Sequence, residues 1–455
     1  MAVVLLLFLT LFSNSKADGD FDVRRHLSTV TRYGAVKDIV DDLFIPSDIP
    51  DGCSPIHLNL VARHGTRSPT KKRMRELENL ASHIKEIIKD AKERNLPLQK
   101  VPAWFHKWEP PWKGKLKGGE LDIKGEEEMY QLGISVRERF PDLFNEEYHP
   151  DVYPIKTTQV PRASASAVAF GMGSFRGKGS LGPGRHRAFA VTSESRASDT
   201  ILRKKQEPAF DKLEEPILTE ITSSLTKRYE FNFTRQDISS LWFLCKQVAL
   251  LEWMDDLQMF IVKGYGKSLN YRMGVPLLKD VVQSMDEAIN AKEGNQVPGS
   301  YEKARLRFAH AETVVPFTCL LGLFLEGSDF ERIRKEPLDF PVKPPQKRKW
   351  RGSTVAPFAG NNMLVLYSCP ANSSSKYFVH VLHNEHPIPM PGCGCTGFCP
   401  FQVFKDKIVQ PHLKHDYDTN ANLDHQKPEA GKFSQLFRWL FGWGNDDTSY
   451  HGVEL

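Results

Sequence analysis

Hydrophobic residues along the chain follow two patterns: short stretches rich in apolar residues, and longer stretches in which apolar residues recur every three or four positions. Continuous apolar runs bounded by polar residues are typical of strands that are buried on both faces of a sheet. We therefore expect strands at residues 56–62, 151–158, 188–192, 305–309, 362–367 and 377–383.

The periodic stretches predict amphipathic helices between these strands, because a helix then carries its apolar side chains on one face. The longest follows the first strand, and its apolar positions are Met74, Leu77, Leu80, Ala81, Ile84, Ile87, Ile88 and Ala91. We expect Ser68 and Pro69 to cap and open this helix. Another helix is expected at residues 126–139, and a further one carries the stripe Leu277, Leu278, Val281, Val282, Met285, Ala288 and Ile289. Strands that alternate with helices predict an α/β protein with a mixed central sheet flanked by helices.

The domain organisation follows from where the pattern changes. Residues 206–299 have helical periodicity without a strand signal, which predicts a mostly α-helical cap domain inserted into the sheet domain. The α/β domain is then expected at residues 51–205 and 300–410. Residues 411–455 form a C-terminal tail whose aromatic run, residues 433–443, is expected to dock on the globule as a helix.

The first 17 residues predict a secretory signal, because an apolar run from Ala2 to Phe12 is followed by small and polar residues up to Ala17. The run is too short to span a membrane, and no other apolar stretch reaches that length. We therefore expect a soluble protein of the secretory pathway, in the endoplasmic reticulum lumen, a vacuole or the extracellular space. Asn232 and Asn372 begin N-x-S/T sequons, where we expect glycans.

Composition narrows the class of ligand. A formal net charge of +5 over 455 residues lacks the strong basic excess of a nucleic-acid-binding protein, but it is compatible with a small anionic substrate. Apolar residues make up 40% of the chain and charged residues 26%, as in ordinary soluble globular proteins. We expect a monomer without a nucleic-acid partner.

Cysteine usage fits an oxidising compartment. Seven cysteines in a secreted chain predict disulfides, and the odd number leaves at least one thiol over within the chain. Cys393, Cys395 and Cys399 crowd a Pro-Gly loop and predict one local bridge. A zinc site is the alternative for these three, although no fourth ligand stands close by in the sequence.

Residues 63–69, Arg-His-Gly-Thr-Arg-Ser-Pro, link the first strand to the longest helix. The carboxyl end of a strand and the amino end of a helix together favour anionic ligands in α/β sheets. Arg63 and Arg67 present rigid donor forks that match phosphate oxygens. His64 can act as a nucleophile near neutral pH and carry a phosphoryl group. The alternative is a basic surface turn, but Arg, His, Gly, Arg and Pro at these spacings are a rare coincidence.

A second stretch repeats this geometry. The predicted strand at residues 305–309 delivers His310 and Glu312 to a helix that we expect to begin at Thr313. Glu312 supplies the proton donor that the first stretch lacks. The predicted strand at residues 151–158 leads into a loop and a helix of small residues, and Arg162 lies at that junction.

Together these stretches resemble the histidine acid phosphatases, the branch that includes phytases and multiple inositol polyphosphate phosphatases. The resemblance extends over about residues 50–410. Inositol polyphosphate phosphatases have His-Ala-Glu where most phytases of the branch have His-Asp, and His-Ala-Glu stands at residues 310–312. The resemblance therefore implies a phosphatase whose substrate is a small polyanion, an inositol polyphosphate such as phytate.

The resemblance also implies roles that the pattern alone leaves open. In this family an arginine after the matching strand binds the scissile phosphate, which implies that role for Arg162. The family likewise implies a disulfide between Cys53 and Cys369, and contacts of Lys71 and Lys72 with further phosphates of the substrate.

We expect a two-step phosphoryl transfer. His64 attacks phosphorus in line and forms a phosphohistidine, while Glu312 protonates the leaving oxygen. The phosphoryl oxygens are expected to be held by Arg63, Arg67, Arg162 and His310. No metal or other cofactor is required, because the arginines take the place of Mg²⁺. A protonated Glu312 predicts an acidic pH optimum.

Two other functions stay open at this point. One is a broad-specificity acid phosphatase of the same fold, and the other is a non-catalytic phosphate- or carbohydrate-binding module. Comparing turnover of phytate and p-nitrophenyl phosphate separates the two enzymes. A binding module would bind phosphate without turnover.

Overall fold

The computed structural model describes residues 23–38, 44–45, 49–95, 108–110, 112, 117–195, 198–202, 234, 236–237, 240, 252, 255–256, 259–260, 263–266, 268–325, 349–370, 374–394 and 397–413. The expected signal segment, nearly all of the expected C-terminal tail and most of the first two-thirds of the expected cap lie outside these ranges. Asn232, Asn372 and Cys395 also lie outside them. Among the helices described, none is both long and apolar enough to cross a membrane.

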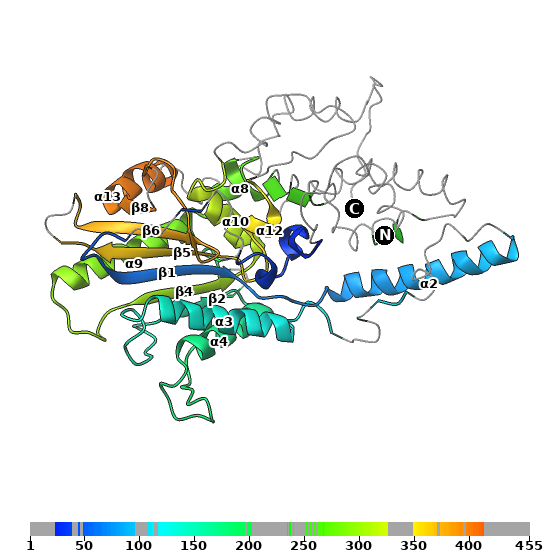
Figure 1. Cartoon of the computed structure of the whole chain (residues 1–455), viewed down its shortest axis with the longest axis horizontal. Coiled ribbons are helices and arrows are strands. Elements are labelled where there is room, and N and C mark those ends of the chain that lie inside the picture. The colour runs from blue at the N-terminus through cyan, green and yellow to red at the C-terminus, as the bar shows by residue number, and fades with distance from the viewer. Residues whose placement is uncertain are drawn as a thin grey trace, which may run out of the picture.

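A mixed sheet forms the centre of the fold, as the alternating pattern predicted (Figure 1). Its strand order is β3-β2-β4-β1-β5-β6-β7, and β8 pairs with β6. The central strand β1 runs parallel to β4 and antiparallel to β5. The strands are β1 (Ser54–Arg63), β2 (Ile155–Thr157), β3 (Thr192–Ser193), β4 (Ala304–Ala309), β5 (Asn361–Ser368), β6 (Tyr377–His383), β7 (His386–Pro387) and β8 (Phe398–Pro400).

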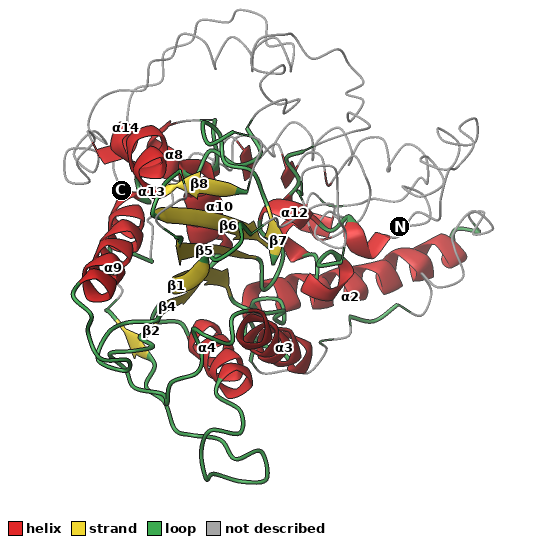
Figure 2. Cartoon of the chain, turned by 60° about the vertical axis from the view of Figure 1, so that its left-hand side comes forward, coloured by secondary structure: helices red, strands yellow, loops and turns green. Residues whose placement is uncertain are grey.

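Helices lie on both faces of the sheet, and the long helix α2 extends away from it (Figure 2). The helices are α2 (Lys71–Glu93), α3 (Ile123–Arg139), α4 (Pro161–Ser174), α8 (Ser268–Arg272), α9 (Val275–Glu293), α10 (Ala311–Leu320), α12 (Gly352–Val355), α13 (Phe401–Phe404) and α14 (Gln410–Leu413). Short 3-10 turns lie at Val23–Arg25, Ser28–Val30 and Tyr33–Ala35, and a π-helical turn lies at Lys405–Val409. All eight apolar positions predicted along α2 are buried.

Alternation along the strands divides the core into two halves. Leu58, Leu60 and Ala62 of β1 pack on the side of α3 and α4, whereas Val61 packs on the side of α9 and α10. Both faces are therefore covered by helices (Figures 1 and 2). That coverage explains why consecutive positions of β1, such as Leu60, Val61 and Ala62, are apolar and buried.

Three predictions about helix ends were wrong, one of them the start of α3, which begins at Ile123 and not at Glu126. Thr70 caps α2 in place of Ser68, since its side chain accepts a hydrogen bond from the backbone N–H of Arg73. Ser68 instead accepts a hydrogen bond from the backbone of Gly119 at 3.1 Å, which ties two loops together. Helix α10 begins at Ala311 and not at Thr313, so Glu312 lies in its first turn.

Two predicted strands are shorter than expected: only Ile155–Thr157 of residues 151–158 forms β2, and little of residues 188–192 is paired. In the second of these stretches, pairing with the sheet begins only at β3, Thr192–Ser193. Upstream of it, the Tyr148 hydroxyl takes the place of a strand partner, accepting from the Ala190 N–H at 3.0 Å and donating to the Ala190 carbonyl at 3.2 Å.

Helix α9 belongs to the stretch that the sequence assigned to the cap, yet it packs against the sheet. Ser284 donates a hydrogen bond to Asn59 Oδ1 at 3.1 Å, and Asn59 Nδ2 donates to the Val281 carbonyl at 3.5 Å. The division into two domains, with a cap at residues 206–299, stays a prediction.

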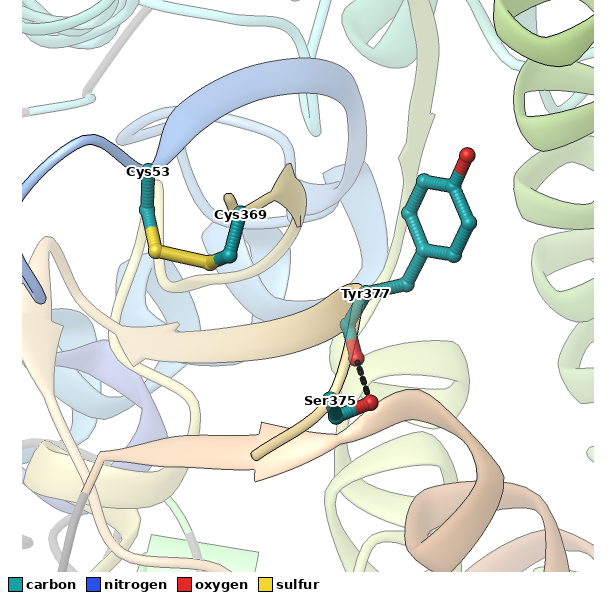
Figure 3. The surroundings of a disulfide bond; sticks show 4 residues. All are labelled: Cys53, Cys369, Ser375 and Tyr377. Carbon is teal, nitrogen blue, oxygen red and sulfur yellow. Dashed lines mark hydrogen bonds between the residues drawn. A yellow bond between two sulfur atoms is a disulfide. The ribbon is translucent and has the colours of Figure 1, made fainter. Parts of the chain in front are cut away.

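Two disulfides fix loop ends. Cys53 directly precedes β1 and Cys369 directly follows β5, and the neighbouring Ser54 and Ser368 are register partners. Figure 3 shows this bridge beside the start of β6, where Tyr377 lies. The pairing implied by the family resemblance is therefore confirmed. The predicted local bridge is confirmed as Cys393–Cys399, which excludes a zinc site that needs both sulfurs as thiolates.

Candidate active site

The two predicted motifs meet at one edge of the sheet. Parallel strands β1 and β4 end together, with Arg63 in register with Ala309. The next residues, His64 and His310, therefore emerge side by side. The His64 N–H donates to the Ala309 carbonyl at 3.0 Å, and the two imidazole rings lie 5.3 Å apart, edge to face.

Strand β2 brings the third predicted element to the same edge. Thr158, just after β2, donates its N–H to the Phe308 carbonyl at 3.2 Å. Its hydroxyl lies 3.0 Å from His310 Nε2, and Arg162 Nη2, in the first turn of α4, lies 3.4 Å from His310 Nδ1. Because a guanidinium can only donate, Nδ1 of His310 accepts, and Nε2 carries the proton and donates to Thr158.

Three residues outside the predicted set hold the loop after β1. Glu128 of α3 accepts from the Thr66 N–H at 2.8 Å and from the Thr66 hydroxyl at 2.9 Å. Ser166 of α4 accepts from the Gly65 N–H at 3.1 Å. Gly125 packs directly on Gly65, where an added Cβ would come within 2.3 Å of the Gly125 carbonyl. The glycine in the motif is therefore required by helix α3.

His64 is buried, with 2% of its surface exposed. Its Nδ1 lies 2.8 Å from the Gly65 carbonyl, and because a carbonyl can only accept, Nδ1 carries the proton. Nε2 therefore keeps its lone pair. Burial, followed by the positive charge of Arg63, holds the pKa of His64 well below its usual value, so the ring is a neutral nucleophile.

The three predicted arginines share one feature: each has a buried Nε–H without a hydrogen-bond partner in the described part of the chain. Arg63 is the most buried, and its Nη1 donates to the Ala356 carbonyl at 2.8 Å while its guanidinium lies over the Phe358 ring. Burial lowers the pKa of Arg63 to about 9, and that of Arg162 to about 10. The charges of Arg67 and Arg162 act in the same direction on Arg63. Such a cluster favours an anion.

Glu312 has a cationic partner in this structure. Its Oε1 lies 2.8 Å from Nζ of Lys263, a residue that the sequence analysis did not single out. Burial raises the pKa of Glu312, but the charge and hydrogen bond of Lys263, a backbone hydrogen bond and the charge of Arg63 together hold it below its ordinary value. The carboxyl group is therefore ionised here, whereas the predicted role requires a proton.

The remaining predicted substrate contacts lie on the surface. Lys71 and Lys72 begin α2 and are exposed, and Lys72 Nζ lies 3.9 Å from Glu76 of the next turn. No contact within the described ranges joins either lysine to His64 or the arginines. Within those ranges, likewise, no group of three or more histidine, cysteine or acidic side chains could hold a metal ion.

The chain matches the family model of the histidine phosphatase superfamily (branch 2) over residues 56–247 and 224–384. That is well over half of the sequence, and it includes both motifs. The chain belongs to branch 2 of the histidine phosphatase superfamily.

Among its relatives is the human multiple inositol polyphosphate phosphatase 1, which is 26% identical over 393 residues, covering 76% of this chain and 77% of the relative. The protein of the same name from Dictyostelium discoideum is 24% identical and covers 82% of this chain and 69% of the relative. A thiamine-repressible acid phosphatase of Schizosaccharomyces pombe is 24% identical and covers 90% of this chain and 92% of the relative.

Solved structures support the fold. The phytase from D. castellii superposes with a TM-score of 0.61 at 16% identity and covers 96% of each chain. The multiple inositol polyphosphate phosphatase of Bifidobacterium longum, solved with inositol hexasulfate, has a TM-score of 0.56 at 16% identity and covers 85% of this chain and 98% of that one. The α/β fold expected from the sequence is thus that of histidine-phosphatase phytases.

Proposed function

We propose that this protein is a phosphomonoesterase that hydrolyses inositol polyphosphates, phytate among them, through a phosphohistidine on His64. The observation that carries the proposal is the state of His64. Its neutral ring is buried, its Nδ1 proton is bound by the Gly65 carbonyl, and its unprotonated Nε2 belongs to a site rich in guanidinium groups. Such a group can attack phosphorus without a separate base.

The first step forms a bond between His64 Nε2 and phosphorus while the ester P–O bond breaks. The leaving oxygen takes the proton of Glu312, once that group is protonated. Arg63, Arg67 and Arg162 stabilise the charge of the transferring group. In the second step water attacks phosphorus, its proton returns to Glu312, and the N–P bond breaks to release phosphate.

Lysine and histidine contacts complete the proposed substrate site. His310 is proposed to turn from its present partners, Thr158 and Arg162, toward a phosphoryl oxygen when substrate binds. Lys71 and Lys72 are proposed to meet the outer phosphates, because they are exposed at the first turn of α2, directly after the motif.

Relatives support the choice of substrate. Several are multiple inositol polyphosphate phosphatases, although acid phosphatases are among them too. A broad-specificity acid phosphatase is therefore the second candidate function. Measuring kcat/KM for phytate and for glycerol 2-phosphate separates the two, since the proposed enzyme strongly prefers phytate and the broad one does not.

A rapid-quench experiment tests the intermediate. Wild-type enzyme mixed with substrate labelled in the phosphoryl group is expected to yield an acid-labile, base-stable label on His64. The variant His64→Ala is expected to lose both label and turnover. His149→Ala is the matched control, because His149 is an exposed histidine paired with Asp151 at 3.5 Å. Full activity in His64→Ala would refute the proposal and leave a binding module as the alternative.

The compartment is proposed on two grounds. Two disulfides are stable where thiols are oxidised, and such conditions hold along the secretory pathway. The apolar N-terminal run is proposed to act as the signal segment. Localising a tagged form of the protein would decide between the endoplasmic reticulum lumen, a vacuole and the extracellular space.

A further inference from the structure

The ion pair between Lys263 and Glu312 poses a problem for catalysis. A general acid must carry a proton, and an ammonium group 2.8 Å from the carboxylate opposes protonation. Arg63, Arg67 and Arg162 add positive charge around the same carboxylate, while His64 and His310 are neutral. In the described part of the chain, Lys263 forms a 2.8 Å ion pair and hydrogen bond with Glu312.

The backbone that carries Lys263 is anchored independently of the ion pair. The next residue, Gly264, packs so tightly on the Trp350 ring that an added Cβ would lie 2.8 Å from it. Tyr265 donates its hydroxyl to the Leu323 carbonyl at 2.8 Å and packs against Trp350. The backbone at Lys263 is thus held in place by its neighbours. The ammonium group can leave Glu312 by rotation of the lysine side chain alone.

Both members of the pair remain accessible. Side-chain exposure is 31% for Lys263 and 35% for Glu312, so a solute can reach either group. A compact ammonium on a four-carbon stem is free to turn toward a nearby phosphate that carries more charge than one carboxylate. A substrate with a single phosphate offers no such second group, because that phosphate lies against His64.

We propose that Lys263 is a specificity-determining positioning residue: it holds Glu312 as a carboxylate until a second phosphate of the substrate draws the ammonium away. Glu312 then takes a proton from solvent and passes it to the leaving oxygen. Proton donation therefore depends on a substrate with more than one phosphate. This inference rests on the proposed function.

The test compares substrates that differ in two properties. Phytate has several phosphates and an alkoxide leaving group, and glycerol 2-phosphate has one phosphate and an alkoxide leaving group. In p-nitrophenyl phosphate the leaving group is a stable phenolate that needs little protonation. Profiles of kcat and KM against pH are measured for wild type, Lys263→Met and Lys263→Arg. Lys376→Met is the matched control, because Lys376 forms a 2.9 Å pair with Glu293 outside the site.

In Lys263→Met, the pH above which kcat/KM for glycerol 2-phosphate declines (the basic limb of the profile) is expected to shift to higher pH by about one unit or more. The value of kcat/KM on that limb then rises about tenfold for each unit. The profile for p-nitrophenyl phosphate is expected to stay in place, and KM for phytate to rise. Preference for phytate falls accordingly. Lys263→Arg is expected to retain the wild-type limb, and a thermal melt reports whether each variant folds.

Two results would overturn the inference. One is an unchanged limb for glycerol 2-phosphate in a folded Lys263→Met, and the other is an equal loss of kcat/KM for all three substrates. Either result leaves the wild-type phosphohistidine and its turnover intact. Failure of the inference is therefore distinguishable from failure of the proposed function, in which wild type itself forms no phosphohistidine.

Discussion

The protein has two clusters of arginine side chains, and they differ in whether carboxylates of the chain balance their charge. One lies on β4, and the other lies at the carboxyl ends of the strands. Arg305 and Arg307 on β4 face α9, where carboxylates meet them. Arg307 is fully buried, yet its Nε donates to Asp280 Oδ2 and its Nη1 to Asn59 Oδ1, each at 2.8 Å. Arg305 donates to Glu302 and Asp280, also at 2.8 Å. We call this group the structural cluster.

The second group, Arg63, Arg67 and Arg162, gathers at the carboxyl edge of the sheet and is called the site cluster. No described hydrogen bond joins any of them to a carboxylate, and each retains a buried Nε–H without a described partner. In the structural cluster, carboxylate partners outweigh burial at Arg305 and raise its pKa above the ordinary value, whereas burial outweighs them at the fully buried Arg307 and lowers its pKa. The pKa of Arg63 is lowered to about 9.

This difference teaches what each cluster is for. A buried charge is costly unless it is paired, and the arginines of the structural cluster are paired with carboxylates of the same chain. In the site cluster, the free energy cost of burying unpaired guanidinium groups is not offset within the free protein. An anionic ligand would offset this cost by pairing with the guanidinium groups. Among the described residues, the carboxylates of Glu312 and Glu128 both act on Arg63, but Glu312 is paired with Lys263 and Glu128 accepts hydrogen bonds from Thr66.

The largest expected effect is on activity when the site cluster is broken. Arg162→Met is expected to lower kcat/KM by about 10⁴-fold, equivalent to about 5.5 kcal/mol, because it removes charge stabilisation of the transferring phosphoryl group. Stability should stay the same or rise, since a poorly balanced charge is removed. Steady-state kinetics and thermal melts check both. Arg94→Met, at the exposed end of α2, is the control. Retained activity within tenfold would contradict the assignment of Arg162.

Breaking the structural cluster is expected to act on stability. Asp280→Ala leaves Arg307 buried without its carboxylate and should cost about 3 kcal/mol in the free energy of unfolding. Denaturant unfolding measures this loss. The double variant Asp280→Ala with Arg307→Met should lose less than the single one, because no uncompensated charge remains. A loss below about 1 kcal/mol in Asp280→Ala would show that the pairing matters little.

The pH dependence of stability reports on His310, which lies beside the site cluster. Burial lowers the pKa of His310 to about 4 from 6.5 in the unfolded chain. As pH falls, the unfolded state therefore takes up a proton before the folded state does. The contribution of His310 to the free energy of unfolding is complete above pH 6.5 and is lost gradually between pH 6.5 and about pH 4. By about pH 5 this loss amounts to about 2 kcal/mol. Replacing the histidine, as in His310→Gln, should shrink the difference in unfolding free energy between about pH 8 and about pH 5. An identical difference in both proteins would contradict the shift.

The smallest effect is expected at the exposed start of α2. Lys72→Ala should change the unfolding free energy by less than about 0.5 kcal/mol, since its pair with Glu76 is solvated. If Lys72 meets an outer phosphate, KM should rise more for phytate than for glycerol 2-phosphate. The matched control is Lys89→Ala, whose pair with Glu93 has the same spacing and the same 3.9 Å distance. Equal KM changes in both variants would remove Lys72 from the site.

Much of the fold could be predicted because strong local signals and tertiary structure agreed. The apolar positions of α2 are buried as expected, and β6 has the predicted bounds. Helix ends were less predictable, since Ser68 and Thr70 are both capping residues and the choice between them depends on a contact with Gly119. Likewise, Tyr148 decides where β3 begins through a bond between residues 42 positions apart.

The candidate site was predictable in part. His64 was found through the motif at residues 63–69, and His310 through the strand-like stretch before it and the proton donor that Glu312 supplies beside it. Glu128, Ser166 and Lys263 were missed, because their roles depend on contacts between distant elements. Gly125 lies directly before the predicted helix, so its identity gave no signal; in the structure it belongs to the first turn of α3 and packs on Gly65.

The claim that the site cluster awaits an anion is tested most directly by the effect of inorganic phosphate on unfolding. At a concentration about a hundred times the dissociation constant, phosphate should stabilise the wild-type protein by about 2.7 kcal/mol. Arg162→Met should lose most of this gain at the same concentration. If phosphate leaves the stability of the wild type unchanged, or stabilises Arg162→Met equally, the account of the arginines is contradicted.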